Sequence, residues 1–253
     1  MTPILELKNI SLNYHTLKDE TKAIEDISLD LNPKEFISIV GPSGCGKTTL
    51  LSIIAGLLKQ SSGTVLLNNL PIDQANNKIG YMFQRDQLFE WRTVAQNVRL
   101  GLEINHTKTP ENERYLDELL EKYGLYEFRD KYPHHLSGGM RQRVALIRTL
   151  VLRPEILLLD EPFSALDYQT RKTVIQDVSS IITSEEKASI LVTHDLGEAV
   201  SLSDRVIVLS SRPCVVKKVF CTSLRKIFLI EERKHTEEYK KTVDKIWKEL
   251  GTA

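Results

Sequence analysis

A glycine-rich stretch that ends in lysine and threonine has the residue types and spacing to bind phosphate. It consists of Gly41, Pro42, Ser43, Gly44, Cys45, Gly46, Lys47, Thr48 and Thr49. The glycines let the backbone wrap around phosphate oxygens with its N–H groups pointing inward. We expect Lys47 to reach the β- and γ-phosphates of a nucleotide, and the Thr48 hydroxyl to bind Mg²⁺. The alternative is a glycine-rich turn without a ligand, but a strand before and a helix after favour phosphate binding.

Two neighbouring carboxylates, Asp160 and Glu161, follow the apolar run Ile156–Leu159. Such a run is typical of a buried strand, and open α/β sheets bind ligands at the carboxyl ends of their strands. Asp160 is suited to hold Mg²⁺, and Glu161 is suited to polarise an attacking water as a general base. An acidic turn that only ends a strand is the alternative. After a phosphate-binding stretch, the pair instead predicts phosphate hydrolysis.

The patterns around these residues predict an α/β fold divided by a mainly helical insert. Strands are expected at Ile4–Leu12, Ile24–Leu31, Phe36–Val40, Val65–Leu67, Ile79–Phe83, Ile156–Leu159, Ile190–Thr193 and Val206–Leu209. Helices are expected at Lys47–Leu58, Thr93–Ile104, Asn112–Tyr123, Gly139–Leu152 and Thr236–Leu250, and between the last strands. The polar stretch Tyr14–Lys22 indicates a loop. We therefore expect one domain over residues 1–253, with the insert at about 85–152 and a C-terminal helix at about 236–250.

The overall composition disfavours several classes of protein. Lysine plus arginine equals aspartate plus glutamate, at 34 each, so no nucleic-acid partner is indicated. No apolar run reaches the roughly 20 residues of a membrane span, and the N-terminus lacks the features of a signal peptide. We expect a cytoplasmic protein that a partner holds at the inner face of the membrane. The three cysteines, Cys45, Cys214 and Cys221, are interpreted as reduced thiols, with Cys45 as a small filler in the phosphate-binding stretch.

A third motif, Leu136–Arg143, contains Ser137, Gly138 and Gly139. Together the motifs strongly resemble the nucleotide-binding subunits of ABC transporters, over about residues 5–219. The resemblance implies a P-loop NTPase core with an antiparallel β subdomain and a helical insert, which binds ATP and Mg²⁺. It also implies that Ser137, Gly138 and Gly139 bind the γ-phosphate of ATP held by a second copy, and that Asp167 lies across that dimer interface. The residue pattern is consistent with this implication, because a loop at Ser137, Gly138 and Gly139 followed by a helix makes a second anion site. A two-fold interface would use the same site in both copies.

The resemblance implies roles for three further residues. Tyr14 would stack on adenine, and the alternative is an ordinary surface aromatic. Gln84 would contact Mg²⁺ or the attacking water and sense the membrane partner. His194, directly after a predicted strand, would contact the γ-phosphate and take part in hydrolysis, and the alternative is a structural polar residue.

The absence of a fused membrane domain favours an importer, with separate permease subunits and, indirectly, a solute-binding protein. The stretches Gln84–Val94 and Leu209–Pro213 resemble the nitrate, sulfonate and taurine importer branch, although Glu90, Ile147, Thr149 and Cys214 depart from it. An exporter, a DNA-repair or translation ATPase, and a regulatory module without hydrolysis are the alternatives. The short insert without heptads and the single cassette disfavour repair and translation, and the presence of both Glu161 and His194 disfavours a module without hydrolysis.

The segment Arg85–Trp91 carries two aromatic residues, Phe89 and Trp91, in a polar setting. Apolar anchors with a polar rim are typical of a groove that receives a helix. We expect this segment to receive a short cytoplasmic helix of the membrane subunit. A connector whose aromatic residues pack into the insert is the alternative.

Overall fold

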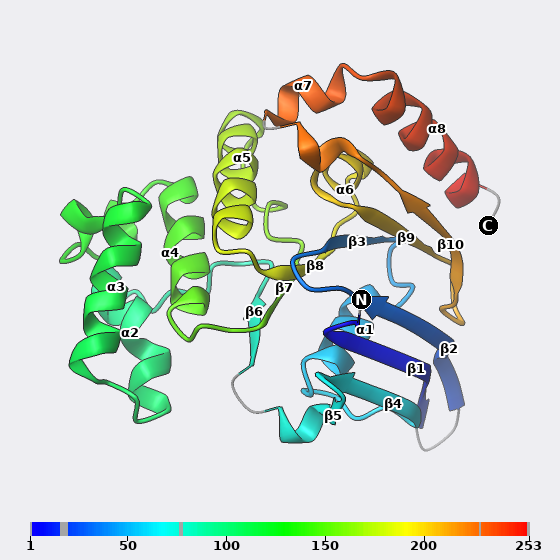
Figure 1. Cartoon of the computed structure of the whole chain (residues 1–253), viewed down its shortest axis with the longest axis horizontal. Coiled ribbons are helices and arrows are strands. Elements are labelled where there is room, and N and C mark those ends of the chain that lie inside the picture. Colours follow the sequence, from blue (N-terminus) through cyan, green and yellow to red (C-terminus); the bar gives the residue numbers. More distant parts are fainter. Residues whose placement is uncertain (1, 16–19, 76–77, 228, 252–253) are drawn as a thin grey trace. The chain divides into compact units, whose positions relative to one another are not determined.

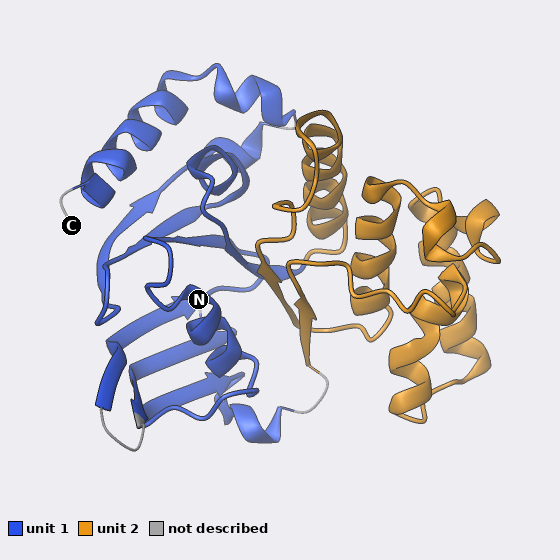
Figure 2. Cartoon of the chain, turned by 180° about the vertical axis from the view of Figure 1, so that it is seen from behind, with its two compact units in different colours: residues 1–76, 187–253 blue, residues 77–186 orange. Residues whose placement is uncertain are grey.

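Figure 1 shows a computed structural model of the chain, which describes residues 2–15, 20–75, 78–227 and 229–251. The chain forms two compact units, shown in different colours in Figure 2. Unit 1 consists of Met1–Asn76 and Lys187–Ala253, and unit 2 consists of Asn77–Glu186. Within the described ranges, no helix combines the length and apolarity that a membrane span needs.

Unit 1 contains an antiparallel sheet in the order β2-β1-β4-β5. Its strands are β1 (Leu5–His15), β2 (Glu20–Leu31), β4 (Ser62–Leu67) and β5 (Leu70–Pro71), followed by the short helix η1 (Ile72–Gln74). Leu5, Leu7, Ile10 and Leu12 of β1 are buried, an alternation that shifts by one residue at the irregularity between Leu7 and Ile10. This is the pattern of a sheet with one covered face. This sheet confirms the predicted antiparallel β subdomain.

The predicted loop at Tyr14–Lys22 is wrong for the described part of that range. Strand β1 continues to His15 and β2 begins at Glu20, with Tyr14 opposite Thr21. The backbone ladder continues because it needs no apolar side chains once the register is set by the buried residues before it. Residues 16–19 lie outside the described residues.

The second set of strands in unit 1 follows the order β10-β9-β3-β8. Strand β3 (Phe36–Val40) pairs in parallel with both β8 (Ala188–Val192) and β9 (Arg205–Leu209), and β10 (Val216–Cys221) is antiparallel to β9. Every residue of β3 and β8 is buried, as their nearly continuous apolar sequences predict. The helices of unit 1 are α1 (Lys47–Ile54), α6 (Leu196–Leu202), η4 (Leu224–Lys226), α7 (Ile230–Lys234) and α8 (Glu237–Gly251).

Helix α1 begins at the predicted residue, Lys47, but ends at Ile54 and not at Leu58. Gly56, just beyond the helix, has a φ of 70°. This left-handed conformation ends many helices and is natural for glycine. The apolar residues after it, which extended the predicted pattern, are therefore not helical.

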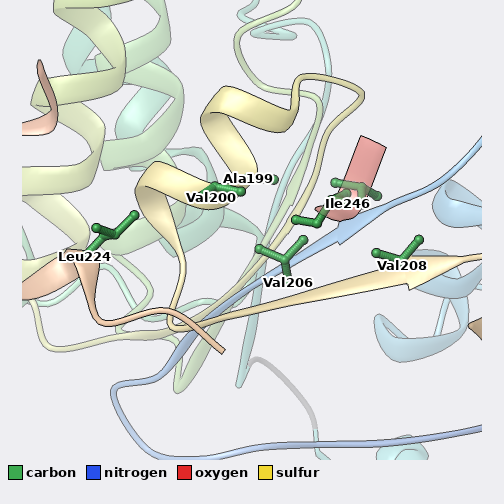
Figure 3. Packing of buried hydrophobic residues seen from close by; sticks show 7 residues of the cluster. Ala199, Val200, Val206, Val208, Leu224 and Ile246 are labelled. Atoms are coloured by element: carbon green, nitrogen blue, oxygen red, sulfur yellow. The ribbon is translucent and has the colours of Figure 1, made fainter. Parts of the chain in front are cut away.

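The C-terminal helix α8 packs on α6 and β9 through a buried apolar cluster (Figure 3). The cluster consists of Val40, Ala199, Val200, Val206, Val208, Leu224 and Ile246. Ile246 comes from α8 and is fully buried, whereas the next residue, Trp247, is exposed. This amphipathic helix confirms the one predicted from the sequence, within a residue at each end.

Unit 2 combines two parallel strands with helices. The strands are β6 (Ile79–Met82) and β7 (Ile156–Asp160). The helices are α2 (Val94–Ile104), α3 (Pro110–Lys122), η2 (Tyr126–Phe128), η3 (Pro133–His135), α4 (Gly138–Leu150) and α5 (Tyr168–Ser184). Thr93 caps α2 and Thr109 caps α3, each through its side-chain oxygen. The structure therefore has the predicted α/β class, with most predicted boundaries correct within two residues.

Candidate active site

The phosphate-binding stretch, residues 41–49, joins β3 to α1 as the sequence predicts and includes the first residues of that helix. These residues are called the phosphate loop. Gly44 and Gly46 have φ values of 72° and 128°, which residues with a side chain rarely adopt. The Cys45 N–H donates to the Pro42 carbonyl oxygen at 3.3 Å and tightens the loop. The loop opens directly into the N-terminus of α1, where the helix dipole favours an anion.

The Lys47 side chain is folded back along this loop. It is only 8% exposed, and its Nζ donates to the carbonyl oxygens of Gly41 at 2.9 Å and Pro42 at 3.0 Å. Thr48, which is exposed, and Thr49, which is half-buried, follow on the first turn of α1. The arrangement fixes one cation and one accessible hydroxyl beside the loop, as phosphate and Mg²⁺ binding require.

His194 lies at the same edge of the sheet as the phosphate loop. Strands β3 and β8 are parallel, with Ile39 opposite Val192, so Gly41 and His194 both follow neighbouring strand ends. The His194 side chain is exposed. The structure thus brings together, within unit 1, the loop and the histidine that the sequence assigned to the γ-phosphate.

The turn that carries His194 is fixed by buried polar contacts on either side of it. The Thr193 hydroxyl donates to Glu198 Oε2 at 2.6 Å, and the Asp195 N–H donates to Thr193 Oγ1 at 3.1 Å. Asp195 also caps α6 by accepting from the Glu198 N–H at 3.0 Å. The sequence interpretation missed Thr193 and Glu198 as positioning residues, because their contact becomes visible only once the strand and helix are folded.

Tyr14 lies near the end of β1, on the pair of strands that passes the phosphate loop. A Cβ atom at Gly46 would lie 3.6 Å from the carbonyl oxygen of Ala23 on β2, and Tyr14 pairs with Thr21 of the same strand. Tyr14 is 42% exposed. An exposed ring at this position is available for stacking on a base.

In unit 2, Asp160 ends β7 and Glu161 follows it. The Asp160 carboxylate is nearly buried and accepts a hydrogen bond from the Tyr81 hydroxyl at 3.1 Å. Glu161 has a φ of 46°, a left-handed conformation that is uncommon for a residue with a side chain. Such strain collects at functional sites, where the surrounding structure imposes it.

Gln84 lies at the same end of the parallel strand pair, since Met82 of β6 is opposite Leu159 of β7. Its Nε2 donates to Ser164 Oγ at 3.1 Å, and that hydroxyl donates to the Glu161 carbonyl oxygen at 2.9 Å. Gln84 is therefore linked through one serine to the backbone of the predicted general base. The sequence interpretation missed the contact between Gln84 and Ser164, and it missed Tyr81, for which no local pattern gives a signal.

The third motif forms the N-terminus of α4. Ser137 caps the helix by accepting from the Met140 N–H at 3.3 Å, and its side chain is exposed. Gly139 is buried against α5, where a Cβ atom would lie 2.8 Å from Cγ2 of Val174. Asp167 caps α5, and hydrogen bonds from Thr170 lower the pKa of its carboxyl group. Gly138 is half-buried, so the two glycines differ in their surroundings.

Residues 24–164 match the sequence profile described as "ABC transporter". An uncharacterised ABC transporter ATP-binding protein of Bacillus subtilis, YtlC, is 42% identical over 249 residues, which cover 98% of this chain and 96% of the relative. The taurine import ATP-binding protein TauB of Roseobacter denitrificans is 41% identical over 217 residues, which cover 85% of this chain and 81% of the relative. Relatives named for nitrate import and for aliphatic sulfonate import are each 43% identical, over 193 and 206 residues.

Solved structures agree with the sequence relatives. The dimeric post-hydrolysis structure of the ATP-binding cassette MJ0796, bound to ADP and Pi, has a TM-score of 0.72 and 31% identity. It covers 86% of this chain, and 98% of its own chain is matched. The chain therefore belongs to the ABC transporter family, as an ATP-binding and ATP-hydrolysing subunit.

Proposed function

We propose that the chain hydrolyses MgATP as a homodimer and drives a membrane permease that imports a small anionic solute, such as nitrate, a sulfonate or taurine. In this proposal residues 1–253 act as one nucleotide-binding domain on the cytoplasmic face of the membrane, with α2, α3 and α4 in its helical insert. The observation that carries the proposal is the phosphate loop with its enclosed Lys47, at the strand edge that also presents His194.

Lys47 neutralises the β- and γ-phosphates, and the backbone N–H groups of residues 43–49 hold their oxygens. Tyr14 supports the adenine ring. The side chains available for Mg²⁺ fit that ion, because the Thr48 hydroxyl and the Asp160 carboxylate are oxygen ligands. Bound Mg²⁺ would offset the negative charge of the phosphates during transfer. Tyr81 orients Asp160 for this role through its hydroxyl.

Glu161 acts as the general base that takes a proton from the attacking water. Gln84 orients the same water or Mg²⁺, and its link through Ser164 to the Glu161 backbone connects the two groups. His194 donates a hydrogen bond to the γ-phosphate. The hydrogen bonds of Thr193 and Asp195 hold the turn that carries His194. Little conformational entropy of this turn is therefore lost at each turnover.

In the proposed homodimer, each ATP contacts the phosphate loop of one subunit and a second phosphate-binding site on the other subunit. Ser137, Gly138 and Gly139 begin a helix of 13 residues, whose N-terminus favours the γ-phosphate of ATP held by the partner. Asp167, an exposed helix cap, lies in the loop that would cross the interface. The dimeric structures of the MJ0796 cassette support the homodimer.

The membrane partner is proposed to bind the segment Arg85–Trp91. Its backbone is held by Arg148, which donates to the carbonyl oxygens of Asp86 and Gln87 at 2.7 Å each. Trp91 is 72% exposed, and its ring centroid lies 4.8 Å from that of half-buried Phe89. A rigid backbone that presents a paired aromatic surface suits a short helix of the permease.

The import proposal rests on the relatives named for taurine, nitrate and aliphatic sulfonate import. Its test is reconstitution of the chain in vesicles with candidate permease and solute-binding proteins from the same organism. We expect ATP hydrolysis to rise when the binding protein carries its anionic solute. The solute should cross the membrane from the side of the binding protein to the side of the ATPase. Stimulation only by unrelated solutes, or movement in the reverse direction, would contradict the import proposal while leaving the ATPase intact.

A further inference from the structure

One buried thiol, Cys45, belongs to the phosphate loop, and a second, Cys214, lies beside the loop. Cys45 is 2% exposed and Cys214 is fully buried, and the two lie close enough for each thiol to shift the pKa of the other. The third cysteine, Cys221, is exposed. Both buried cysteines belong to unit 1, so their contact is internal to one compact body.

The surroundings leave the loop little room to move independently of this pair. A Cβ atom at Gly41 would lie 3.0 Å from Cys45 Sγ, and one at Gly46 would lie 3.5 Å from the Cys214 Cβ. Cys214 is fixed to β2, since its N–H donates to the Ala23 carbonyl oxygen at 3.0 Å and its own carbonyl accepts from the Glu25 N–H at 2.9 Å. A covalent bond between Cys45 and Cys214 would therefore pull on the phosphate loop.

The two thiols differ in acidity in the way that thiol oxidation requires. The neighbouring Cys214 thiol and the nearby Lys47 ammonium lower the pKa of Cys45 to about 6, against the opposing effect of burial. The same contact and its burial raise the pKa of Cys214. Cys45 is therefore the nucleophilic thiolate near neutral pH, and Cys214 is the protonated partner.

We propose that Cys45 and Cys214 form a modification site, at which hydrogen peroxide produces a disulfide that disables the phosphate loop. The Cys45 sulfur attacks peroxide, the O–O bond breaks, and the departing hydroxide becomes water, which leaves a sulfenic acid on Cys45. The Cys214 sulfur then attacks the Cys45 sulfur and loses its proton, and the S–O bond breaks to release a second water. Two thiols and one peroxide give one disulfide and two waters, and the sulfur pair loses two electrons. Peroxide is small enough to suit buried thiols.

The disulfide would weaken ATP binding, an effect that rests on the proposed role of the loop. An S–S bond is about 2.05 Å long, much shorter than any contact between unbonded sulfur atoms. Because Cys214 is anchored to β2 by two backbone hydrogen bonds, the loop residues around Cys45 must make most of the movement. Their N–H groups then no longer point at the phosphate positions, and Lys47 moves with them.

The test uses the full chain carrying Cys221→Ser, which removes the exposed thiol. The reduced protein is treated with hydrogen peroxide, quenched with catalase, digested without reductant and analysed by mass spectrometry. We expect a peptide containing Cys45 joined to one containing Cys214. ATP affinity, measured by calorimetry, should fall about tenfold or more on oxidation, and should return after dithiothreitol.

The matched control adds Cys214→Ala to the same background, with Cys214→Ser as a second variant if the first does not fold. Either variant should bind ATP as the parent does when reduced, and should show no joined peptide and no tenfold loss after peroxide. The proposal is overturned if the parent forms no Cys45–Cys214 link, if the linked protein binds ATP normally, or if the control loses binding equally. Failure of the reduced parent to bind ATP would instead contradict the proposed function.

Discussion

The two glycines at the start of α4 should have different physical roles, and alanine substitutions separate them. A Cβ atom at Gly139 would lie 2.8 Å from Cγ2 of Val174, whereas one at Gly138 would lie 3.2 Å from Cδ2 of Leu166. Val174 is buried on α5 and is stiff at χ1, so it has little freedom to move away. The Leu166 contact is made by the far end of a longer and more flexible side chain.

The expected magnitude follows from two opposing contributions. Overpacking a well-filled contact costs about 1–3 kcal/mol, and replacing glycine by alanine in a helix returns up to about 1 kcal/mol. Gly139→Ala should therefore lower the free energy of unfolding by roughly 1–2 kcal/mol, or about 2–8 °C in melting temperature for a chain of this size. Gly138→Ala should change stability by less than about 0.5 kcal/mol.

A double-mutant cycle with Val174→Ala tests the cause of this loss. Val174→Ala removes the clashing methyl group, so the double variant should be more stable than the sum of the single effects predicts, by about 1 kcal/mol. Urea and thermal unfolding of the four proteins give the coupling. If Gly139→Ala is not destabilising, or if Val174→Ala gives no favourable coupling, the packing role of Gly139 is wrong.

Three further predictions concern ATP and the membrane partner. Mixing a Lys47→Ala subunit with a Ser137→Arg subunit should restore part of the ATPase activity that each variant lacks alone, since one of the two shared sites is then intact. A shared site would be contradicted if no activity returned and the phosphate loop crosslinked to residue 137 only within one chain. Replacing Phe89 and Trp91 by alanine should reduce co-purification with the permease while ATP affinity of the lone chain is unchanged, whereas a large fall in melting temperature would indicate a packing role. Tyr14→Ala should weaken ATP binding by about 1–3 kcal/mol, the scale of base stacking on an aromatic side chain. Tyr14→Phe should bind ATP as the parent does, and equal ATP affinities of the Ala and Phe variants would exclude stacking.

The sequence predicted those elements whose patterns are local. The apolar residues of Phe36–Val40 end abruptly at Gly41, and the strand has those bounds in the structure. The end of α1 was missed because Leu57 and Leu58 continue the apolar pattern, although Gly56 has already ended the helix. Strand β10 was missed because it lies at an edge and none of its side chains is fully buried, so it has no apolar signature.

The same limit applies to the candidate site. Roles for Lys47, Asp160 and Ser137 could be predicted because each residue belongs to a contiguous motif with a known chemical use. The partners that position them come from other elements, such as Tyr81, whose hydroxyl contacts Asp160. The contact between Cys45 and Cys214 was likewise missed, and Cys45 was interpreted as a filler, because only folding brings the two thiols together.

The proposed mechanism of ATP hydrolysis requires Glu161 as its general base. Steady-state turnover of Glu161→Gln should be about 10²–10⁴-fold slower than that of the parent, the range over which a general base contributes. ATP affinity should be retained, because the phosphate loop and Ser137 are unchanged, and light scattering should find the variant as an ATP-bound dimer. Near-normal turnover by this variant, with ATP binding intact, would contradict the mechanism.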